Sequence, residues 1–322
     1  MIRWEAHTCL PTHPQADFAP LDALHAAGVN HLSLNVGADM NPLPQIMAVL
    51  AAFRARIAAA PERYVLAASV GDVRRAAAEG KLSIAFDLEG ALPLQEQPEM
   101  VGLFAALGVR QIHFAYNRNN NVADGCHDSE RGLTPLGRRM VEAVNRAGVL
   151  MDCSHTGRNC SLDIMAASSQ PVIFSHANPL ALARHGRNIT DEQIRACAAT
   201  GGVVCISGLS FFVGKEYPNA DDVARHVACV AEIAGAEHVG IGLDICFDQD
   251  GLDYSAWGEI DRNYWWPARD YDLSGPPPTF TPPQTWQQLP EALQRVGLSP
   301  KEIEGVLGGN MLRVAERVWA PS

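Results

Sequence analysis

The chain has 322 residues, of which 47% are hydrophobic and 19% are charged, and its formal net charge at pH 7 is −11. This composition supplies ample apolar material for a core and excludes an intrinsically disordered chain. The acidic balance and the absence of a Lys/Arg run argue against a nucleic-acid partner, because nucleic-acid binders present a basic face. The length suits an α/β barrel, which needs about 250 residues, so we expect residues 1–322 to form a single domain.

The sequence carries no pattern for export or membrane insertion. Its first residues, MIRWEAHTCLP, contain no basic segment followed by an apolar run, and no stretch of about 20 apolar residues occurs. We therefore expect a cytoplasmic protein with no membrane partner. The eight cysteines form no Cys-x-x-Cys pair and mostly lie in apolar runs. This predicts buried, reduced thiols, with Cys9 as the exception.

Short apolar runs alternate with segments of helical spacing along the whole chain. Runs rich in Val, Ile, Leu and Phe are typical of strands that are buried on both faces of a parallel sheet. The predicted strands cover residues 3–9, 31–36, 83–88, 109–116, 149–154, 171–175, 202–206 and 238–243.

Helices are predicted between these strands from the spacing of their apolar residues. Examples cover residues 44–60, 134–147, 191–200 and 221–234. Thr190, followed by Asp191 and Glu192, predicts an N-cap with an acidic first turn. Glycines just before the next strand suit left-handed caps at helix ends. These glycines are Gly28, Gly80, Gly108, Gly148 and Gly201.

Strands that alternate with helices eight times predict a (β/α)8 barrel, with a doubly wound open sheet as the structural alternative. The stretch 246–283 is rich in Pro, Asp and aromatic residues, which predicts a long loop over the barrel mouth. Its aromatic residues would close a lid or make a dimer contact, or alternatively form a cage for an ammonium group. They are Trp257, Tyr264, Trp265, Trp266 and Tyr271. The tail from Thr285 predicts helices outside the barrel.

Polar side chains stand at or just past the carboxyl ends of the predicted strands, where barrels form their active sites. In chain order they are His7, Cys9, Glu89, Tyr116, Asn117, His155, His176 and Asp244. Imidazole, carboxylate and thiolate groups together are ligands of Zn²⁺ and similar transition metals. The pattern therefore predicts a metal site at the barrel mouth.

Each of these residues also has a plain structural interpretation. A histidine at a strand end is more often a satisfied structural residue, and an aspartate there often caps the next helix. Glu89 is more unusual, because it lies in the apolar run IAFDLEGALPL, where a carboxylate is costly unless it is paired or bound to metal. Its structural alternative is a buried salt bridge to an arginine.

The sequence resembles the renal (membrane) dipeptidase family of amidohydrolase-like metal-dependent hydrolases over nearly its whole length. The matching segments are DLEG (87–90), YNRNNNVADG (116–125), GLTPLGRRMVEAVNRAGVLMDCSHTG (132–157), PVIFSHANPLALARHGRNITDEQI (171–194), HVGIGLD (238–244) and LGGNMLRV (307–314). The two longest segments are specific enough that an unrelated barrel would not be expected to contain them.

The resemblance implies a dinuclear zinc centre at the mouth of a (β/α)8 barrel. It implies that Glu89 is the carboxylate that bridges the two ions and that His155 and His176 are ligands of one ion. The other ion would use His7 and the residue two positions further along the chain, Cys9.

Cys9 departs from the family pattern. Relatives have His-x-Asp followed by Leu-Pro where this chain reads His7-Thr8-Cys9-Leu10-Pro11. A thiolate binds zinc well, at about 2.3 Å, but it reaches less far than a carboxylate and binds through one atom. Two interpretations stay open: Cys9 is a softer ligand of a second ion, or it is a buried thiol beside a one-metal site.

The resemblance also implies roles for residues around the metals. Arg187, in the motif HGRN, would bind a substrate carboxylate, because a guanidinium pairs with both carboxylate oxygens. Asn117 and Asn188 are also predicted to contact the substrate. The structural alternative for Arg187 is a surface ion pair. Asp244 would transfer the proton, and Tyr116 would donate a hydrogen bond to the oxyanion.

Together these residues predict a zinc-dependent hydrolase of a small amide with a free carboxylate, most simply a dipeptide. A different small amide or an N-acyl amino acid is one alternative, because fold and metals do not fix the substrate. A metal-poor, non-catalytic binding protein is another, which the change at Cys9 leaves open. The resemblance further leads us to expect a homodimer.

Overall fold

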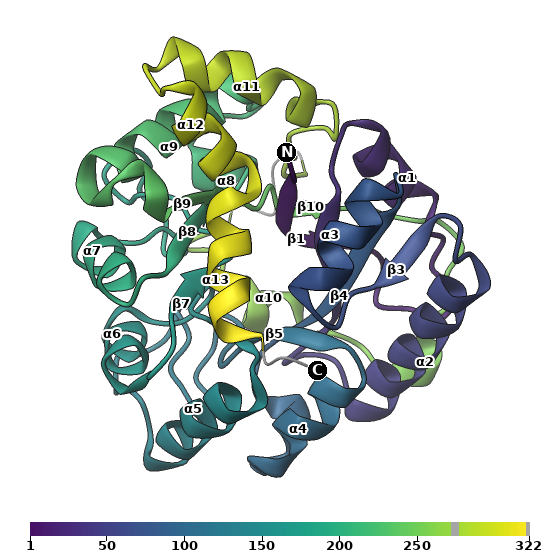
Figure 1. Ribbon diagram of the computed structural model, residues 1–322. Helices are drawn as coiled ribbons and strands as arrows, with labels where there is room; N and C mark the ends of the chain where they lie inside the picture. The colour runs from purple at the N-terminus through teal and green to yellow at the C-terminus, as the bar shows by residue number, and fades with distance from the viewer. Residues whose placement is uncertain (272–276, 320–322) are drawn as a thin grey trace.

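A closed ring of parallel strands surrounded by helices forms the centre of the protein (Figure 1). The computed structural model describes residues 1–271 and 277–319. The strands of the ring are β1 (Trp4–Cys9), β2 (His31–Ala38), β4 (Leu82–Glu89), β5 (Val109–His113), β6 (Leu150–Asp152), β7 (Val172–Phe174), β8 (Val203–Ile206), β9 (Val239–Ile241) and β10 (Ile245–Cys246). Neighbouring strands pair in parallel from β1 to β9, and β10 pairs in parallel with β1.

The last barrel strand is interrupted, and its two halves close the ring. β9 pairs with β8, whereas β10 pairs with β1. Between the halves, Gly242 N donates to Ile206 O at 3.1 Å. The closed ring confirms the predicted (β/α)8 barrel, because a doubly wound sheet would leave two open edges.

The buried carboxylate of Glu5 ties this closure to the C-terminal part of the chain. Glu5 Oε1 accepts from Leu243 N at 2.7 Å, and Glu5 Oε2 accepts from Trp286 Nε1 at 3.0 Å. Burial raises the pKa of Glu5 to about 8, although these hydrogen bonds lower it. The first strand, the interrupted last strand and a C-terminal helix are thereby held together.

Helices cover the outside of the ring, as the alternating pattern predicts (Figure 1). They are α1 (Ala19–Ala26), α2 (Leu43–Ala59), α3 (Val70–Ala78), α4 (Glu99–Ala106), α5 (Pro135–Ala147), α6 (Arg158–Ala167), α7 (Asp191–Ala199) and α9 (Ala220–Ala234). The predicted N-cap of α7 is confirmed, since the Thr190 side chain accepts from Gln193 N. The five predicted glycine caps all have a positive φ, between 64° at Gly148 and 103° at Gly108.

Two short strands escaped prediction, and several predicted strands were too long, among them the one over residues 109–116. β3 (Tyr64–Leu66) pairs with the first half of β4, and β10 forms the end of the last barrel strand. β5 ends at His113, so Tyr116 and Asn117 lie in the following loop and not within the strand. Three-residue and two-residue strands carry too little periodicity to be recognised from their sequence.

The C-terminal helices close the amino-terminal end of the barrel. α11 (Thr285–Arg295) and α12 (Pro300–Glu304) pack outside, and α13 (Asn310–Val318) crosses the end of the ring (Figure 1). Met311 and Val314 of α13 join a buried cluster with Trp4, Leu150 and Val203 from the first residues of barrel strands. Apolar side chains therefore fill this end of the barrel, and the predicted polar site residues lie at the opposite, carboxyl end.

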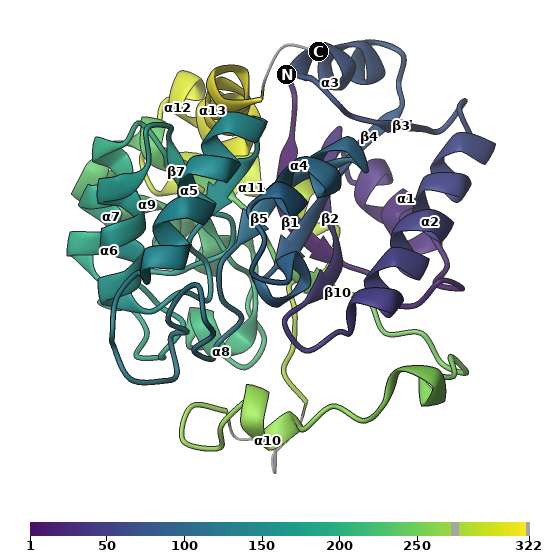
Figure 2. The ribbon, with the colours of Figure 1, turned by 90° about the horizontal axis from the view of Figure 1, so that it is seen from below.

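The long loop after β10 lies on the opposite side from α13 and passes beneath the carboxyl end of the barrel (Figure 2). It contains α10 (Arg262–Trp265) and is fastened to the mouth by Asn117, whose Nδ2 donates to Trp265 O at 2.9 Å. The predicted loop over the mouth is therefore confirmed, although its residues 272–276 lie outside the described residues. Within the described ranges, no helix has the length and hydropathy that a membrane crossing requires.

The close approach of the last strand to β7 gives a test of the closure. A Cβ atom at Gly242 would lie 1.8 Å from the backbone oxygen of Ser175. We expect Gly242→Ala to lower the free energy of unfolding by about 1–3 kcal/mol or more, because backbone must move to admit the methyl group. Gly102→Ala in α4 is the matched control, since a Cβ atom there meets no atom within 4 Å.

Urea unfolding of both variants against the wild type is the measurement. Gly102→Ala should be neutral or more stable by up to about 1 kcal/mol, because alanine favours helix. Equal stability of the two variants would contradict the close approach.

Candidate metal centre

The five predicted metal ligands come from four barrel strands and meet at one end of the ring. His7 and Cys9 lie in β1, and Glu89 is the last residue of β4. His155 follows β6, and His176 follows β7. Because the strands are parallel, their carboxyl ends gather these side chains at the same mouth.

Glu89 lies at the middle of this cluster. Its Oε1 atom is 2.9 Å from His155 Nε2 and 3.5 Å from both His7 Nε2 and His176 Nε2. Glu89 is only 6% exposed, and none of the salt bridges in the described part of the chain joins it to an Arg or Lys. Burial raises its pKa, although His7 and His113 oppose the shift. The structural alternative of a salt bridge to an arginine is therefore wrong.

The three imidazoles are oriented in the same way, with one nitrogen held and the other facing Glu89. His155 Nδ1 lies 2.7 Å from Asn117 Oδ1, and His176 Nδ1 lies 2.8 Å from Ser175 Oγ. His7 Nδ1 lies 3.3 Å from Asp87 Oδ2. Histidines that bind metal are typically oriented by such a second partner.

The geometry around His155 fits a bound cation. Asn117 Oδ1 can only accept, so His155 Nδ1 carries the proton and Nε2 of the neutral ring is an acceptor, which also lies 2.9 Å from His176 Nε2. This acceptor faces the Glu89 carboxylate at 2.9 Å. Two acceptors at that distance repel each other unless a proton or a cation lies between them. A divalent transition metal is the ion that an imidazole–carboxylate set prefers.

The protonation of the histidines divides them into two kinds. Burial holds the pKa values of His155 and His176 well below the usual range, so both rings are neutral and ready to bind metal. Burial also lowers the pKa of His7, but the carboxylates of Asp87 and Glu89 outweigh it and hold that pKa well above the usual range. His7 is therefore protonated when no metal is present.

Backbone strain is concentrated at this mouth. Asn117, His155 and Asp244 are non-glycine residues with φ values of 60°, 66° and 60°. Such left-handed backbone is costly for residues other than glycine and often marks functional sites. At each position the turn directs a polar side chain toward the centre just after a barrel strand ends.

Cys9 lies beside His7, but it also has a partner that the sequence did not reveal. Its Sγ atom is 3.3 Å from His7 Nε2. Cys246 occupies the paired position on β10, and the ligand atoms of Cys9, Asp244 and Cys246 all lie within 4.8 Å of one another. Cys246 and burial raise the pKa of Cys9 well above its usual value. The interpretation of Cys246 as an ordinary buried thiol is wrong, since it is exposed and beside the centre.

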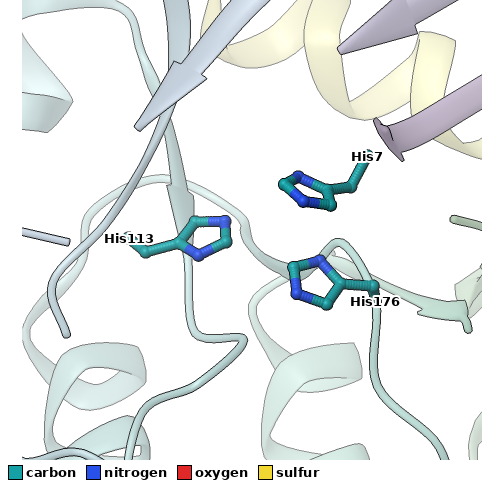
Figure 3. A group of neighbouring side chains, drawn as sticks. All are labelled: His7, His113 and His176. Atoms are coloured by element: carbon teal, nitrogen blue, oxygen red, sulfur yellow. The ribbon is translucent and has the colours of Figure 1, made fainter. Parts of the chain in front are cut away.

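His113 is a fully buried member of the cluster that sequence reasoning missed. Its ring centroid lies 6.0 Å from that of His7, 5.9 Å from that of His155 and 5.5 Å from that of His176. Figure 3 shows its ring directed toward His7 and His176. The predicted strand continued to Tyr116, which made His113 look like an interior strand residue; its imidazole within the run VRQIHFAY was the available signal.

Arg187 is buried at the edge of the centre. Its Nη2 atom donates to His176 O at 3.1 Å, and its guanidinium carbon lies 5.1 Å from the centroid of the Phe212 ring. Its Nε atom has no hydrogen-bond partner among the described residues. Being 2% exposed, Arg187 does not form the surface ion pair that was its structural alternative. It lines a cleft of about 810 Å³ together with Asn188 and Thr156.

Four further predicted site residues lie around the metal centre: Tyr116, Asn117, Asn188 and Asp244. The Tyr116 ring stacks on His155 with centroids 4.2 Å apart, and burial raises its pKa well above the usual value. Asn188 Nδ2 donates to Ala183 O and Phe212 O, at 2.8 and 2.9 Å. Asn117 is fully buried, and its side chain is engaged by His155 and Trp265. Asp244 Oδ1 lies 3.8 Å from His7 Nε2.

The sequence and the fold are similar to those of known peptidases. The membrane dipeptidase family, peptidase family M19, matches residues 35–258. Dipeptidase tcpJ of Claviceps purpurea (strain 20.1) is 28% identical over 262 residues, which are 80% of this chain and 56% of that protein. Dipeptidase verJ of Clonostachys rogersoniana is 30% identical over 260 residues, which are 80% of this chain and 61% of that protein. The chain thus spans little more than half the length of these relatives.

Solved structures share the whole fold at low sequence identity. An amidohydrolase from Pseudomonas aeruginosa has a TM-score of 0.85 at 24% identity, covering 99% of this chain and 96% of that one. A metallopeptidase from Rhodobacter sphaeroides, liganded with a phosphinate mimic of the dipeptide L-Ala-D-Ala, has a TM-score of 0.79 at 18% identity, covering 99% of both chains.

The raised pKa of His7 predicts that metal binding releases protons. His7 must lose its proton before it can bind Zn²⁺, so binding near pH 7 should release protons and strengthen as the pH rises. Calorimetric titration of the metal-free protein with Zn²⁺, in two buffers of different ionisation enthalpy, measures this release. His7→Gln should release fewer protons than the wild type. Identical heats for the wild type in both buffers would contradict the prediction.

Proposed function

This chain belongs to the membrane dipeptidase family, and we propose that it is a metal-dependent hydrolase of small amides with a free carboxylate, most simply dipeptides. The observation that carries the proposal is the buried Glu89 carboxylate facing the unprotonated Nε2 of His155 at 2.9 Å, with His7 and His176 beside it. A metal-poor binding protein would need a proton between these two acceptors. We therefore favour an enzyme over a metal-poor binding protein.

We propose zinc as the ion, held by Glu89, His155 and His176, with His7 and Cys9 beside Glu89 as the place of a second ion. Each residue type is a common zinc ligand. When bound, zinc lowers the pKa of water toward about 7 and polarises a carbonyl group. The raised pKa of the Cys9 thiol means that metal must displace its proton before sulfur can bind.

Arg187 is the proposed anchor for the substrate carboxylate. Its buried guanidinium lines the cleft of about 810 Å³ and has an Nε atom that no described residue satisfies. A carboxylate would supply the missing acceptor and pair with the planar guanidinium. Clefts of about 300–1,000 Å³ suit small molecules. Asn188 lines the same cleft and is proposed as a further contact with the substrate.

Asp244 and Tyr116 are proposed to act on the reacting groups. Burial raises the pKa of Asp244 to about 7, so near neutral pH this carboxyl group can both take and return a proton. The Tyr116 hydroxyl keeps its proton, because burial raises its pKa, and it can donate a hydrogen bond to the oxygen that becomes negative. The contacts of Asn117 favour a positioning role through His155 in place of the expected substrate contact.

A comparison of free and amidated dipeptides tests the function and the role of Arg187. We expect hydrolysis of dipeptides with a free C-terminus and much slower hydrolysis of the same dipeptides with an amidated C-terminus. Arg187→Ala should lower kcat/KM on the free dipeptides by about 10–100-fold, which corresponds to one charged hydrogen bond. The same variant should barely change kcat/KM on the amidated ones.

Arg139→Ala, which removes an exposed arginine of α5, is the matched control and should keep wild-type kinetics. Equal rates of hydrolysis for free and amidated dipeptides would refute the role of Arg187. Hydrolysis of N-acyl amino acids but of no dipeptide would favour the alternative substrate class.

A further inference from the structure

Two cysteines lie side by side at the rim of the metal centre, one on the first strand and one on the end of the last. Cys9 of β1 pairs with Cys246 of β10 in the parallel register, and Phe247 N donates to Cys9 O at 3.0 Å. Neighbouring strands lie about 4.8 Å apart, so paired side chains on one face are adjacent. The ligand atoms of the two cysteines and of Asp244 all lie within 4.8 Å of one another.

The alternation of side chains along β1 places this pair on the same face as a proposed metal ligand. Residues two positions apart point to the same side of a strand, so Cys9 shares its face with His7. The Sγ atom of Cys9 lies 3.3 Å from His7 Nε2. Sulfur atoms from two strands therefore adjoin the place proposed for the second ion.

The two thiols are close to each other and can be reached from solvent. A hydrogen bond with Cys246 raises the pKa of Cys9, and burial adds to this shift. Both cysteines are free; Cys246 is exposed, and Cys9 is partly buried. The pair therefore connects the buried centre with the surface, where an ion can arrive.

The cysteine at position 9 explains why a second sulfur is needed. Relatives have an aspartate where this chain has Cys9. A carboxylate offers two oxygen atoms to an ion, whereas a thiolate offers a single sulfur atom. The second position has thus lost a donor atom, and Cys246 stands in the paired position that can replace it.

The spacing of the two sulfurs suits one zinc ion. Zinc binds sulfur at about 2.3 Å, so two sulfurs on the same ion lie no more than about 4.6 Å apart. The ligand atoms of Cys9 and Cys246 are within 4.8 Å of each other, so little movement is required. Cysteine thiolates combined with histidine are a common set of zinc ligands.

We propose that Cys246 is a metal ligand and that Cys9 and Cys246 together hold the second ion through two thiolates, beside His7. Such a pair selects Zn²⁺ over Mn²⁺ and Mg²⁺, which prefer oxygen ligands. This inference rests on the proposed function, because it assumes that the centre holds metal. It does not depend on the substrate, and it leaves the proposed part of Asp244 in proton transfer unchanged.

X-ray absorption at the zinc edge counts the sulfurs bound to metal in the wild-type protein. The protein is saturated with Zn²⁺ under a phosphine reductant, which keeps thiols reduced without adding sulfur. Sulfurs per zinc, multiplied by zinc ions per chain, should give two sulfurs per chain. One sulfur or none would overturn the proposal. This measurement needs no variant, so a folding defect cannot obscure it.

Cobalt absorption identifies which cysteine is bound. Co²⁺ bound to thiolate has a charge-transfer band in the near ultraviolet whose intensity rises with the number of sulfurs. Cys246→Ser, saturated with Co²⁺, should lose at least about half of the wild-type band, because one of two soft ligands is gone. A band of wild-type intensity in Cys246→Ser, or no band in the wild type, would overturn the proposal.

Cys229→Ser is the matched control for the cobalt measurement. Cys229 is a free and partly buried cysteine of α9, on the outside of the barrel (Figure 1). Its replacement removes a thiol of similar exposure to Cys9 at a distance from the proposed ligands. This variant should keep the full wild-type band.

Dipeptide turnover, measured on the same wild-type samples, separates this inference from the proposed function. Two sulfurs per chain without turnover of any dipeptide would refute the dipeptidase and leave the thiolate pair standing. Turnover of dipeptides with one sulfur or none would refute the thiolate pair alone.

Discussion

The structure depends on one electrostatic constraint, a buried carboxylate surrounded by imidazoles with no arginine or lysine beside it. Glu89 Oε1 lies 2.9 Å from His155 Nε2, and the basic side chains within 4 Å of its carboxylate in the described chain are histidines, of which His7 is the protonated one. Burying such a group is costly unless a cation or a proton balances it. Glu89 in this place therefore needs a positive charge that the surrounding side chains do not fully provide.

Other parts of the molecule hold the side chains around Glu89 in place. The interrupted last strand closes the ring and places Asp244 between its two halves, while α13 fills the opposite end. Around the centre, Asp87, Asn117 and Ser175 each hold one nitrogen of a histidine. Asn117, His155 and Asp244 share a left-handed backbone, a region in which few residues other than glycine are found.

Much of this could be predicted from the sequence, for identifiable reasons. Apolar runs alternating with helical spacing reveal a barrel, and strand ends in a parallel barrel must converge, so His7, Glu89, His155 and His176 were predicted to meet. The position of His113 was missed because the end of β5 is not marked by any turn residue before Tyr116. Cys246 was missed because β10 has two residues, too few for a pattern, so its pairing with Cys9 appears only in the fold. The burial of Asn117 depends on contacts with the distant Trp265, which local sequence does not encode.

Metal content per chain, measured by plasma emission spectroscopy after stripping, reloading with Zn²⁺ and gel filtration, decides whether the constraint at Glu89 is met by an ion. We expect at least one tightly held equivalent in the wild type and its loss when His155 and His176 are both replaced by alanine. A wild-type protein that keeps no metal after reloading would contradict a metal centre and show that a proton balances Glu89.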